Sequence, residues 1–305
     1  MYYLGIDGGG TKTKVVIIDE KSNILYEKIS GPSSLDTVSE AITLENIRLA
    51  LVDFFKIPKF HNAHFKGVFA GLGGIFSNKD KDKLKAILGK LPGVDSSTRV
   101  IGESDAENAL ASGLLFDEGI TLIAGTGMVA YGKNLNNQTH KAGGVGYKEG
   151  DLGSSYDLGI NALRAVARAI DNRFNKTSFT DELMEHLKII TMSDIQILTE
   201  RWYLERTKVA ALAPFVTKHA NLGNIYAMNI CDNATYELSL AVHAVYHTLA
   251  LVNPTLVIVG SLGNTDGYFK DKLHANLKAL IPNLKIIKPQ IDPAYAAAKL
   301  ALHHN

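Results

Sequence analysis

Residues 1–19 read MYYLGIDGGGTKTKVVIID, and this stretch says more about the fold than any other in the chain. An apolar, β-prone run ends in the glycine turn GGGTKT, and a second apolar run follows directly. The pattern predicts two strands joined by a tight turn, with a third strand over ILYEKI at 24–29. Because the turn leads into a strand and not a helix, it does not fit the dinucleotide-binding fingerprint, and the Walker A pattern is absent.

The opening pattern returns in the middle of the chain. Residues 119–144 again place an apolar strand before a glycine–threonine turn, a second strand and a polar turn. Setting Leu4–Gly8 against Thr121–Gly125 aligns both glycine turns and both polar hairpin turns. Similarity over a whole supersecondary unit predicts a duplicated fold.

The other segments mix helices and strands. The first half predicts helices over 43–55 and 79–91 and strands over 64–74 and 98–105, and a helix begins near residue 105. The second half is mostly helical and closes with strand, helix, strand and a last helix; its predicted helices are 157–172, 180–189, 193–206, 207–221 and 222–252. This order predicts an α/β protein with two similar lobes. The predicted lobes are residues 1–115 and 116–291, with residues 292–305 packing back on the first lobe.

Composition limits the functional classes. The chain has 305 residues, 46% hydrophobic and 21% charged, which is typical of a globular protein. Its 32 basic and 31 acidic side chains are spread along the chain, which predicts neither a nucleic-acid nor a membrane partner. No leader peptide or membrane-length apolar run is apparent, which predicts a cytoplasmic protein. The single cysteine, Cys231, excludes an intrachain disulfide and is expected to be buried.

Glycine-rich turns follow three apolar strands, at Asp7–Lys12, Ala124–Gly127 and Gly260–Gly263. Nucleotide phosphates need close approach of backbone N–H groups, which glycine permits, and threonine adds a hydroxyl donor. Two such hairpins facing each other across a cleft would clamp the phosphates from opposite sides. Any one of these turns is more often only a tight turn. All three together, each after a strand, predict nucleotide binding.

The chain resembles the BadF/BadG/BcrA/BcrD-type ATPase family over nearly its whole length. The resemblance rests on these segments, in this order: MYYLGIDGGGTKTKVVIID, SDAENALASG, IAGTGMVAYG, GGVGYKEGDLGSSYDLG, VAALAPFV, LVIVGSLG and PAYAAAKLAL. That family includes N-acetylglucosamine kinase and some archaeal hexokinases. Membership implies two ribonuclease H-like lobes of the actin/hexokinase type with a nucleotide cleft between them. It also implies a sugar kinase that uses ATP and Mg²⁺.

The resemblance implies roles for individual residues. Asp7 is expected to hold Mg²⁺ through water, and Asp105 to be the base that takes the proton of a sugar hydroxyl. The implied nucleotide-binding residues are Gly8, Gly9, Gly10, Thr11, Lys12, Gly125, Thr126, Gly127, Ala213, Gly260, Ser261 and Gly263. Gly260 and Gly263 are expected to leave room for the purine and ribose. The implied substrate-binding residues are Ser34, Asp105, Gly144, Val145, Gly146 and Asp151.

Both aspartates also have simpler interpretations. Asp7 fits a turn cap, and Asp105 fits the N-cap of the helix that follows, with Glu107 and Asn108 as surface residues. Besides Asp105, the carboxylates that qualify as the base are Glu103, Glu107 and Asp151.

Three positions depart from the pattern of the amino-sugar kinases and leave more than one sugar open. Ser34, Val145 and Leu152 stand where the amino-sugar kinases often have asparagine, an aromatic residue and glutamate. The main expectation is an amino or N-acetylated hexose phosphorylated at its 6-hydroxyl, with glucose and N-acetylmuramic acid as alternatives.

Other functional classes are less favoured. An ATPase activator of a dehydratase or reductase shares the fold, but generally needs cluster-binding cysteines, and this chain has one. A non-catalytic sensor is disfavoured because Asp105 and all the phosphate turns are present. Relatives with this fold often dimerise, so a homodimer is the assembly to test.

Overall fold

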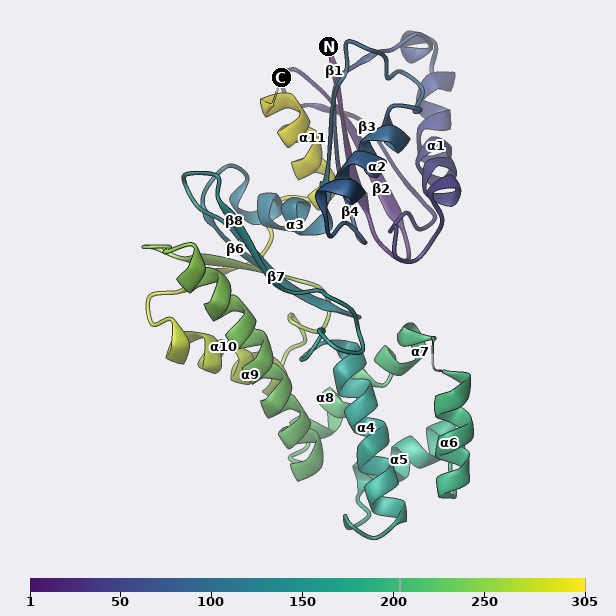
Figure 1. Cartoon of the computed structure of the whole chain (residues 1–305), viewed down its shortest axis with the longest axis vertical. Helices are drawn as coiled ribbons and strands as arrows, with labels where there is room; N and C mark the ends of the chain where they lie inside the picture. The colour runs from purple at the N-terminus through teal and green to yellow at the C-terminus, as the bar shows by residue number, and fades with distance from the viewer. Residues whose placement is uncertain (203, 305) are drawn as a thin grey trace. The chain divides into compact units, whose positions relative to one another are not determined.

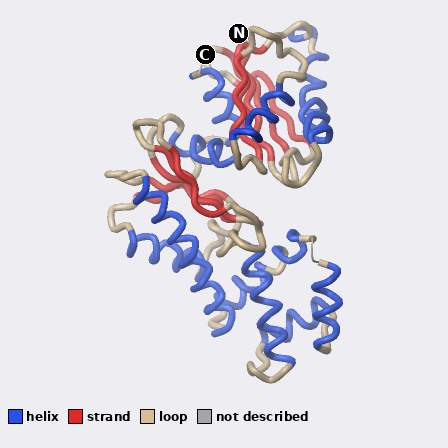
Figure 2. The backbone as a smooth tube through the Cα atoms, in the orientation of Figure 1, coloured by secondary structure: helices blue, strands red, loops and turns tan. Residues whose placement is uncertain are grey.

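The computed structural model describes residues 1–202 and 204–304, which divide into two compact units. Unit 1 comprises Met1–Asp117 and Pro289–Asn305, and unit 2 comprises Glu118–Lys288. Each unit is built around one five-stranded sheet (Figures 1 and 2). Tyr203, within the predicted helix 193–206, and Asn305, at the end of the predicted return 292–305, lie outside the described residues.

Unit 1 opens with the predicted hairpins. Its sheet has the strand order β3-β2-β1-β4-β5; β1, β2 and β3 are antiparallel neighbours, whereas β4 runs parallel to β1 and β5 parallel to β4. Its elements are β1 (Tyr2–Gly8), β2 (Thr13–Asp19), β3 (Ile24–Ser30), α1 (Glu40–Lys56), η1 (Pro58–Phe60), β4 (Phe65–Leu72), α2 (Asn78–Leu88), β5 (Arg99–Ser104), α3 (Asp105–Leu114) and α11 (Pro293–His303).

Helices cover both faces of this sheet because its central strands β1, β2 and β4 bury side chains on both sides. Leu4 and Ile6 belong to a core shared with α1 and α2, whereas Tyr3 belongs to a second core with the alanines of α11. Gly5 allows α11 to approach β1: a Cβ there would lie 2.7 Å from the Cα of Ala298. The C-terminal helix thus packs on the first strand (Figure 1).

Unit 2 repeats the strand topology, which confirms the predicted duplication. Its sheet has the order β10-β9-β6-β7-β8, so β6 to β10 take the places of β1 to β5. The strands are β6 (Gly119–Ala124), β7 (Met128–Lys133), β8 (Thr139–Gly143), β9 (Thr255–Val259) and β10 (Lys285–Ile287). The helices are α4 (Ser155–Ile170), α5 (Ser178–Leu187), α6 (Met192–Arg201), α7 (Arg206–Ala210), α8 (Ala213–Asn221), α9 (Ile225–Thr248) and α10 (Tyr268–Leu280).

Three predicted helices of unit 2 differ clearly from those in the structure. The helix predicted over 193–206 ends at Arg201, and the one predicted over 207–221 is two helices, α7 and α8. Pro214 explains the second break: it stands in the first turn of α8, where its missing N–H leaves no hydrogen bond unmade. The helix predicted from residue 222 begins at Ile225, because the side chain of Asn224 accepts hydrogen bonds from the N–H groups of Tyr226 and Ala227.

Cys231 is fully buried in α9, and burial raises the pKa of its thiol to about 12. Such a thiol is neutral at physiological pH and unreactive. Among the described residues, no helix has the length and apolar character needed to cross a membrane.

Candidate functional site

The carboxyl ends of three parallel strands meet at one edge of the sheet in unit 1. Asp7 on β1 pairs with Gly71 on β4, which pairs with Glu103 on β5. Asp105 follows β5 directly as the first residue of α3. Carboxyl ends of parallel strands are where α/β folds place their ligands. The sheet therefore brings Asp7 and Asp105 to the same edge.

Asp7 is held by a buried asparagine. Asn108, which has no exposed surface, donates from Nδ2 to Asp7 Oδ1 at 2.9 Å and to the carbonyl of Ile6 at 3.0 Å. Burial raises the pKa of Asp7 to about 6; the hydrogen bond from Asn108 opposes that rise, and the charge of Asp105 adds to it. Within the described residues the carboxylate accepts no hydrogen bond from the following turn, so it is not a turn cap.

Asn108 is a residue that sequence reasoning missed. It was expected at the surface if Asp105 capped the helix, but α3 turns it toward the ends of β1 and β4. The available signal was its spacing: Asn108 is three residues after Asp105 and so shares a helix face with it.

The first glycine turn exposes backbone donors. The N–H of Gly9 donates to the carbonyl of Lys12 at 2.9 Å. Across residues 1–202 and 204–304, the N–H groups of Gly10, Thr11 and Lys12 have no acceptor, and all three residues are exposed. Successive free N–H groups in a turn form a concave site for anions.

Ser34 and Asp105 converge on Gly73. The N–H of Gly73 donates to the carbonyl of Gly8 at 2.9 Å, and the N–H of Ser34 donates to the carbonyl of Gly9 at 3.2 Å. A Cβ on Gly73 would lie 3.6 Å from Asp105 Oδ2 and would overlap the hydroxyl of Ser34. The two substrate residues predicted in this unit are thus brought together, next to the glycine turn.

The structure also changes the alternatives for Asp105. The N-cap of α3 is Ser104, so the capping interpretation of Asp105 is wrong: the helix already includes it. Glu103 is paired with Lys81, whose Nζ lies 2.6 Å from Oε2. That pairing makes Glu103 a weaker candidate for the base.

The second glycine turn joins β6 to β7 in unit 2. The N–H of Gly125 donates to the carbonyl of Gly127 at 3.0 Å, and the N–H of Ser155 at the start of α4 donates to the carbonyl of Gly125 at 2.8 Å. A Cβ on Gly125 would point into open space. A Cβ on Gly127 would lie 2.6 Å from Oδ2 of Asp151, which is 6% exposed. The turn and the predicted sugar-binding carboxylate are therefore neighbours.

A cavity of about 340 Å³ adjoins this turn within unit 2. Predicted nucleotide-binding residues from three distant segments line it: Thr126, Ala213 and Ser261. Its other lining residues are Ser155, Thr207, Ala210, Ala211, Pro214, Thr217, Leu262 and Thr265. Small-molecule sites are typically concave, of roughly 300–1,000 Å³, and combine apolar walls with a few polar groups. We call this space the nucleoside cavity.

Gly260 and Gly263 both pack against the end of β6. The φ angle of Gly260 is +100°, and a Cβ there would lie 2.7 Å from the carbonyl carbon of Ala124. The N–H of Gly263 donates to the carbonyl of Ala124 at 3.2 Å. Neither glycine lines the nucleoside cavity, whereas Ser261 and Leu262 between them do. These glycines let the turn pack on the end of β6, and that packing presents Ser261 to the cavity.

The loop after β8 carries the other predicted sugar residues. Gly144 and Gly146 have φ angles of +65° and +128°, which favour glycine. Val145 between them is 71% exposed. It lies against Gly150, where a Cβ would overlap Cγ2 of Val145.

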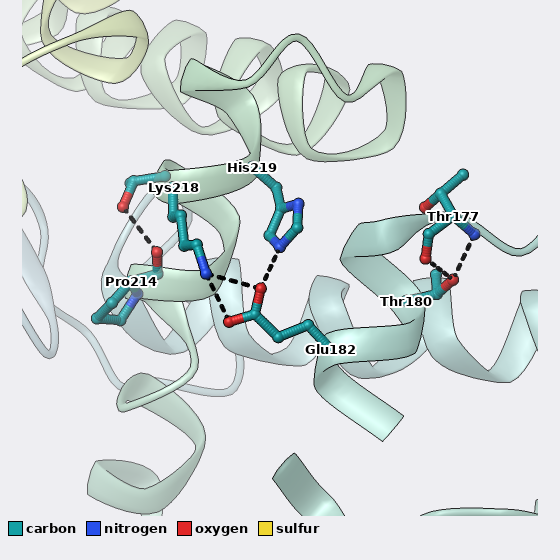
Figure 3. A network of polar contacts seen from close by, with 7 residues as sticks. Thr177, Thr180, Glu182, Pro214, Lys218 and His219 are labelled. Carbon is teal, nitrogen blue, oxygen red and sulfur yellow. Dashed lines mark hydrogen bonds and ion pairs between the residues drawn. The ribbon is translucent and has the colours of Figure 1, made fainter. Parts of the chain in front are cut away.

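A polar network holds α8, the helix that forms one wall of the nucleoside cavity (Figure 3). Glu182 on α5 accepts hydrogen bonds from Nζ of Lys218, at 2.7 and 2.8 Å, and lies 2.7 Å from Nε2 of His219. The side chain of His219 is 3% exposed. Ala213 and Thr217 of the same helix line the cavity. The network was not foreseen because its partners lie 36 and 37 residues apart in sequence.

The hydrogen bonds from Lys218 and then His219 hold the pKa of Glu182 below its usual value. A carboxylate whose pKa is lowered by folding stabilises the protein above its unfolded pKa and loses that effect as pH falls through its folded pKa. Glu182→Gln is therefore expected to lower the melting temperature at pH 7, with a difference from wild type that shrinks below about pH 4. The measurement is thermal unfolding of both proteins across this pH range.

Glu185→Gln is the matched control, because Glu185 is exposed on the same helix and has no ion pair in the described part of the chain. It should melt like wild type at every pH. A Glu182→Gln difference that stays constant from pH 7 to pH 3 would refute the ion-pair account.

Asp7 is also the residue suited to hold a metal. No three His, Cys, Asp or Glu side chains gather into a metal cage among residues 1–202 and 204–304. Mg²⁺ in phosphoryl-transfer sites usually needs no such cage, since it binds one or two carboxylates, retained waters and substrate phosphates. Asp7 fits this need: Asn108 occupies Oδ1, and Oδ2 accepts no hydrogen bond in the described residues.

Comparison with known proteins identifies relatives of matching length. The model of the BadF/BadG/BcrA/BcrD ATPase family matches residues 4–301. The chain is 30% identical over 306 residues to the N-acetylmuramic acid/N-acetylglucosamine kinase of Clostridium acetobutylicum, covering 98% of each chain. It is also 30% identical over 319 residues to the N-acetyl-D-glucosamine kinase of Dictyostelium discoideum, covering 99% of this chain and 98% of that one.

Solved structures support the same fold. A candidate N-acetylglucosamine kinase from Chromobacterium violaceum superposes with a TM-score of 0.79 at 22% identity, covering 99% of this chain and 98% of that one. The predicted fold class is therefore confirmed.

Proposed function

Because the chain belongs to the BadF/BadG/BcrA/BcrD ATPase family, we propose that it is an ATP-dependent sugar kinase acting on the 6-hydroxyl of an amino or N-acetylated hexose. The observation that carries this proposal is the full-length similarity to two curated kinases, both named for N-acetylglucosamine. The local chemistry agrees with it: a cavity of nucleoside size adjoins a glycine turn, and a half-buried aspartate follows the carboxyl end of a parallel strand.

We assign the nucleoside of ATP to the nucleoside cavity. Its alanines offer apolar surface to a purine, while Thr126, Ser261 and Thr265 offer hydroxyls to the ribose and the first phosphate. The phosphates are assigned to the two glycine turns. The free N–H groups of Gly10, Thr11 and Lys12 supply the donors in the first turn.

Asp105 is assigned as the general base. A sugar hydroxyl is too weakly acidic to ionise at neutral pH, so its proton must pass to an acceptor as the oxygen bonds to the γ-phosphorus. The Asp105 carboxylate takes that proton, the bond from the γ-phosphorus to the bridging oxygen breaks, and ADP leaves. Ser34, beside Asp105 at Gly73, is assigned to orient the sugar, and Asp151 to accept hydrogen bonds from its hydroxyls.

Mg²⁺ bound through water at Asp7 would neutralise charge on the phosphates when present. Asn108 would keep the carboxylate turned to the strand edge by occupying one of its oxygens. An enzyme that consumes ATP and a free sugar also belongs in the cytoplasm, where both are available.

N-acetylmuramic acid is the second candidate substrate. The specific observation is that the Clostridium relative, similar over its full length, is named for both sugars. An activator of a dehydratase is set aside, because Cys231 is fully buried and cannot hold a cluster at a subunit surface.

The test is ADP release measured with N-acetylglucosamine, glucosamine, glucose and N-acetylmuramic acid, and without sugar. We expect release to depend on sugar and to be highest with one of the N-acetylated sugars. Mass spectrometry of the product should place the phosphate on the 6-hydroxyl. Equal ADP release with and without every sugar would exclude a sugar kinase and return the activator or sensor classes to consideration.

A further inference from the structure

Unit 2 contains a second cavity, of about 460 Å³, between α4 and α9. It shares no lining residue with the nucleoside cavity. We call it the α4–α9 groove, and its lining residues are Asn161, Arg164, Ala165, Arg168, Phe174, Tyr226, Asn229, Ile230, Asp232 and Asn233. The helices that form it are labelled in Figure 1. None of these residues has a part in the proposed kinase reaction.

Two arginines line the groove, and neither is paired with a carboxylate in the described residues. Arg164 and Arg168 stand one turn apart on α4, and neither forms an ion pair within the residues that the structure describes. The guanidinium of Arg168 lies 5.1 Å from the ring centroid of Phe174, a cation–π contact. That contact orients the group but leaves its hydrogen-bond donors available.

Arg164 is also held in place and not neutralised. Its Nη1 donates to Oδ1 of Asn161 at 3.1 Å. Asn161 in turn donates from Nδ2 to Oδ1 of Asp157 at 2.9 Å. Asp157 precedes Asn161 by one turn of α4. Its other oxygen, Oδ2, accepts a hydrogen bond from the N–H of Gly153 at 2.9 Å. Because the contact to Arg164 is made by the neutral amide of Asn161 and not by a carboxylate, the guanidinium keeps donors for an anion from solution.

The rest of the groove suits a hydroxylated molecule. The rings of Phe174 and Tyr226 are stacked at 4.2 Å with an interplanar angle of 4°, and form an apolar wall. Asn229 and Asn233, one turn apart on α9, make no side-chain hydrogen bond to any described residue. A free amide offers both donors and an acceptor, which is what a hydroxyl group needs.

The acidic residue of the groove is already engaged. Asp232 accepts a hydrogen bond from the hydroxyl of Tyr268 at 2.7 Å and lies 3.4 Å from Nζ of Lys272. Lys272 therefore balances the charge of Asp232.

The charges of Asp157 and Asp171 act on Arg164 and Arg168. Neither carboxylate forms an ion pair with these arginines in the described residues, so the hydrogen-bond donors of both arginines stay available to a ligand.

From this juxtaposition we propose that the α4–α9 groove is a second ligand site, which binds a small hydroxylated molecule carrying a phosphate monoester or a carboxylate. The guanidinium groups take the anion, because their planar fork matches either group. The side chains of the asparagines form hydrogen bonds with the hydroxyl groups, and the stacked rings cover one face of the carbon skeleton. The volume fits a molecule of hexose size. This site is independent of the proposed kinase activity.

The test is isothermal titration calorimetry of the full chain without nucleotide, using glucose 6-phosphate, gluconate and neutral glucose as probes. We expect at least one anionic probe to bind, and the tighter of the two identifies phosphate or carboxylate as the preferred group. Arg164→Gln combined with Arg168→Gln should weaken that binding at least about tenfold, because charge-assisted hydrogen bonds are lost. Any binding of glucose should be the same in both proteins.

Two further variants sharpen the result. Arg164→Lys combined with Arg168→Lys keeps the charge but loses the fork, so its affinity should fall between those of wild type and the glutamine variant. Arg201→Gln is the matched control, since Arg201 is an exposed arginine at the end of α6 and does not line the groove. If neither anion binds wild type, or if the double glutamine variant binds it unchanged, the proposal is wrong. Because no nucleotide or turnover is involved, that failure would leave the kinase proposal standing.

Discussion

Asp105→Asn is expected to lower kcat by about a hundred- to ten-thousand-fold, the usual contribution of general-base catalysis. Asparagine has the shape of aspartate but cannot take the proton of the sugar hydroxyl. Asp105 is the first residue of α3 and not its N-cap, so the substitution should leave the melting temperature near that of wild type. The measurement is steady-state kinetics with the best sugar of the panel, together with calorimetric titration of ATP, whose affinity should hardly change.

Glu103→Gln is the control for this variant. Glu103 lies near the carboxyl end of β5, two residues before Asp105, and its carboxylate is paired with Lys81. Its loss should leave kcat within about threefold of wild type, as is usual for a surface ion pair. A folded Asp105→Asn enzyme that keeps most of its kcat would rule out Asp105 as the base. Glu107 and Asp151 would then be the carboxylates to substitute next.

Gly125→Val is expected to weaken ATP binding by roughly ten- to a hundredfold for each charge-assisted hydrogen bond to phosphate that it blocks. A Cβ at this position meets no atom within 4 Å, so the folded protein can accommodate the side chain. In the proposed complex that open space is where the phosphates lie. Calorimetric titration of ATP should show the loss, while the melting temperature of the free protein changes little.

Adenosine provides an internal control for Gly125→Val. It has no phosphates, and the nucleoside cavity does not include Gly125, so the variant should bind adenosine as wild type does. Unchanged ATP affinity would contradict the assignment of this turn to phosphate. Equal losses for ATP and adenosine would point instead to a distorted cavity.

Local sequence patterns were sufficient for the strands, the glycine turns and the duplication. Alternating apolar residues and glycines act through neighbours a few positions away, so their effect can be recognised without tertiary structure. The break between α7 and α8 is also a local feature, because Pro214 marks it, whereas apolar spacing alone predicts one continuous helix. The roles proposed for Asp7, Asp105 and the phosphate turns come from the family resemblance.

Tertiary structure alone decided which distant groups meet. Asn108 contacts Asp7 across 101 residues of sequence, and Glu182 meets His219 across 37. The nucleoside cavity and the α4–α9 groove each draw their walls from separate segments. The close packing of Gly260 on the backbone of Ala124 likewise depends on tertiary structure. The sequence by itself determined the helices, the strands and the residue types of the turns, because short-range sterics and hydrophobic periodicity govern them. Burial and long-range hydrogen bonding depend on packing. Only the folded chain therefore decided the cavities and the partners of each charged group.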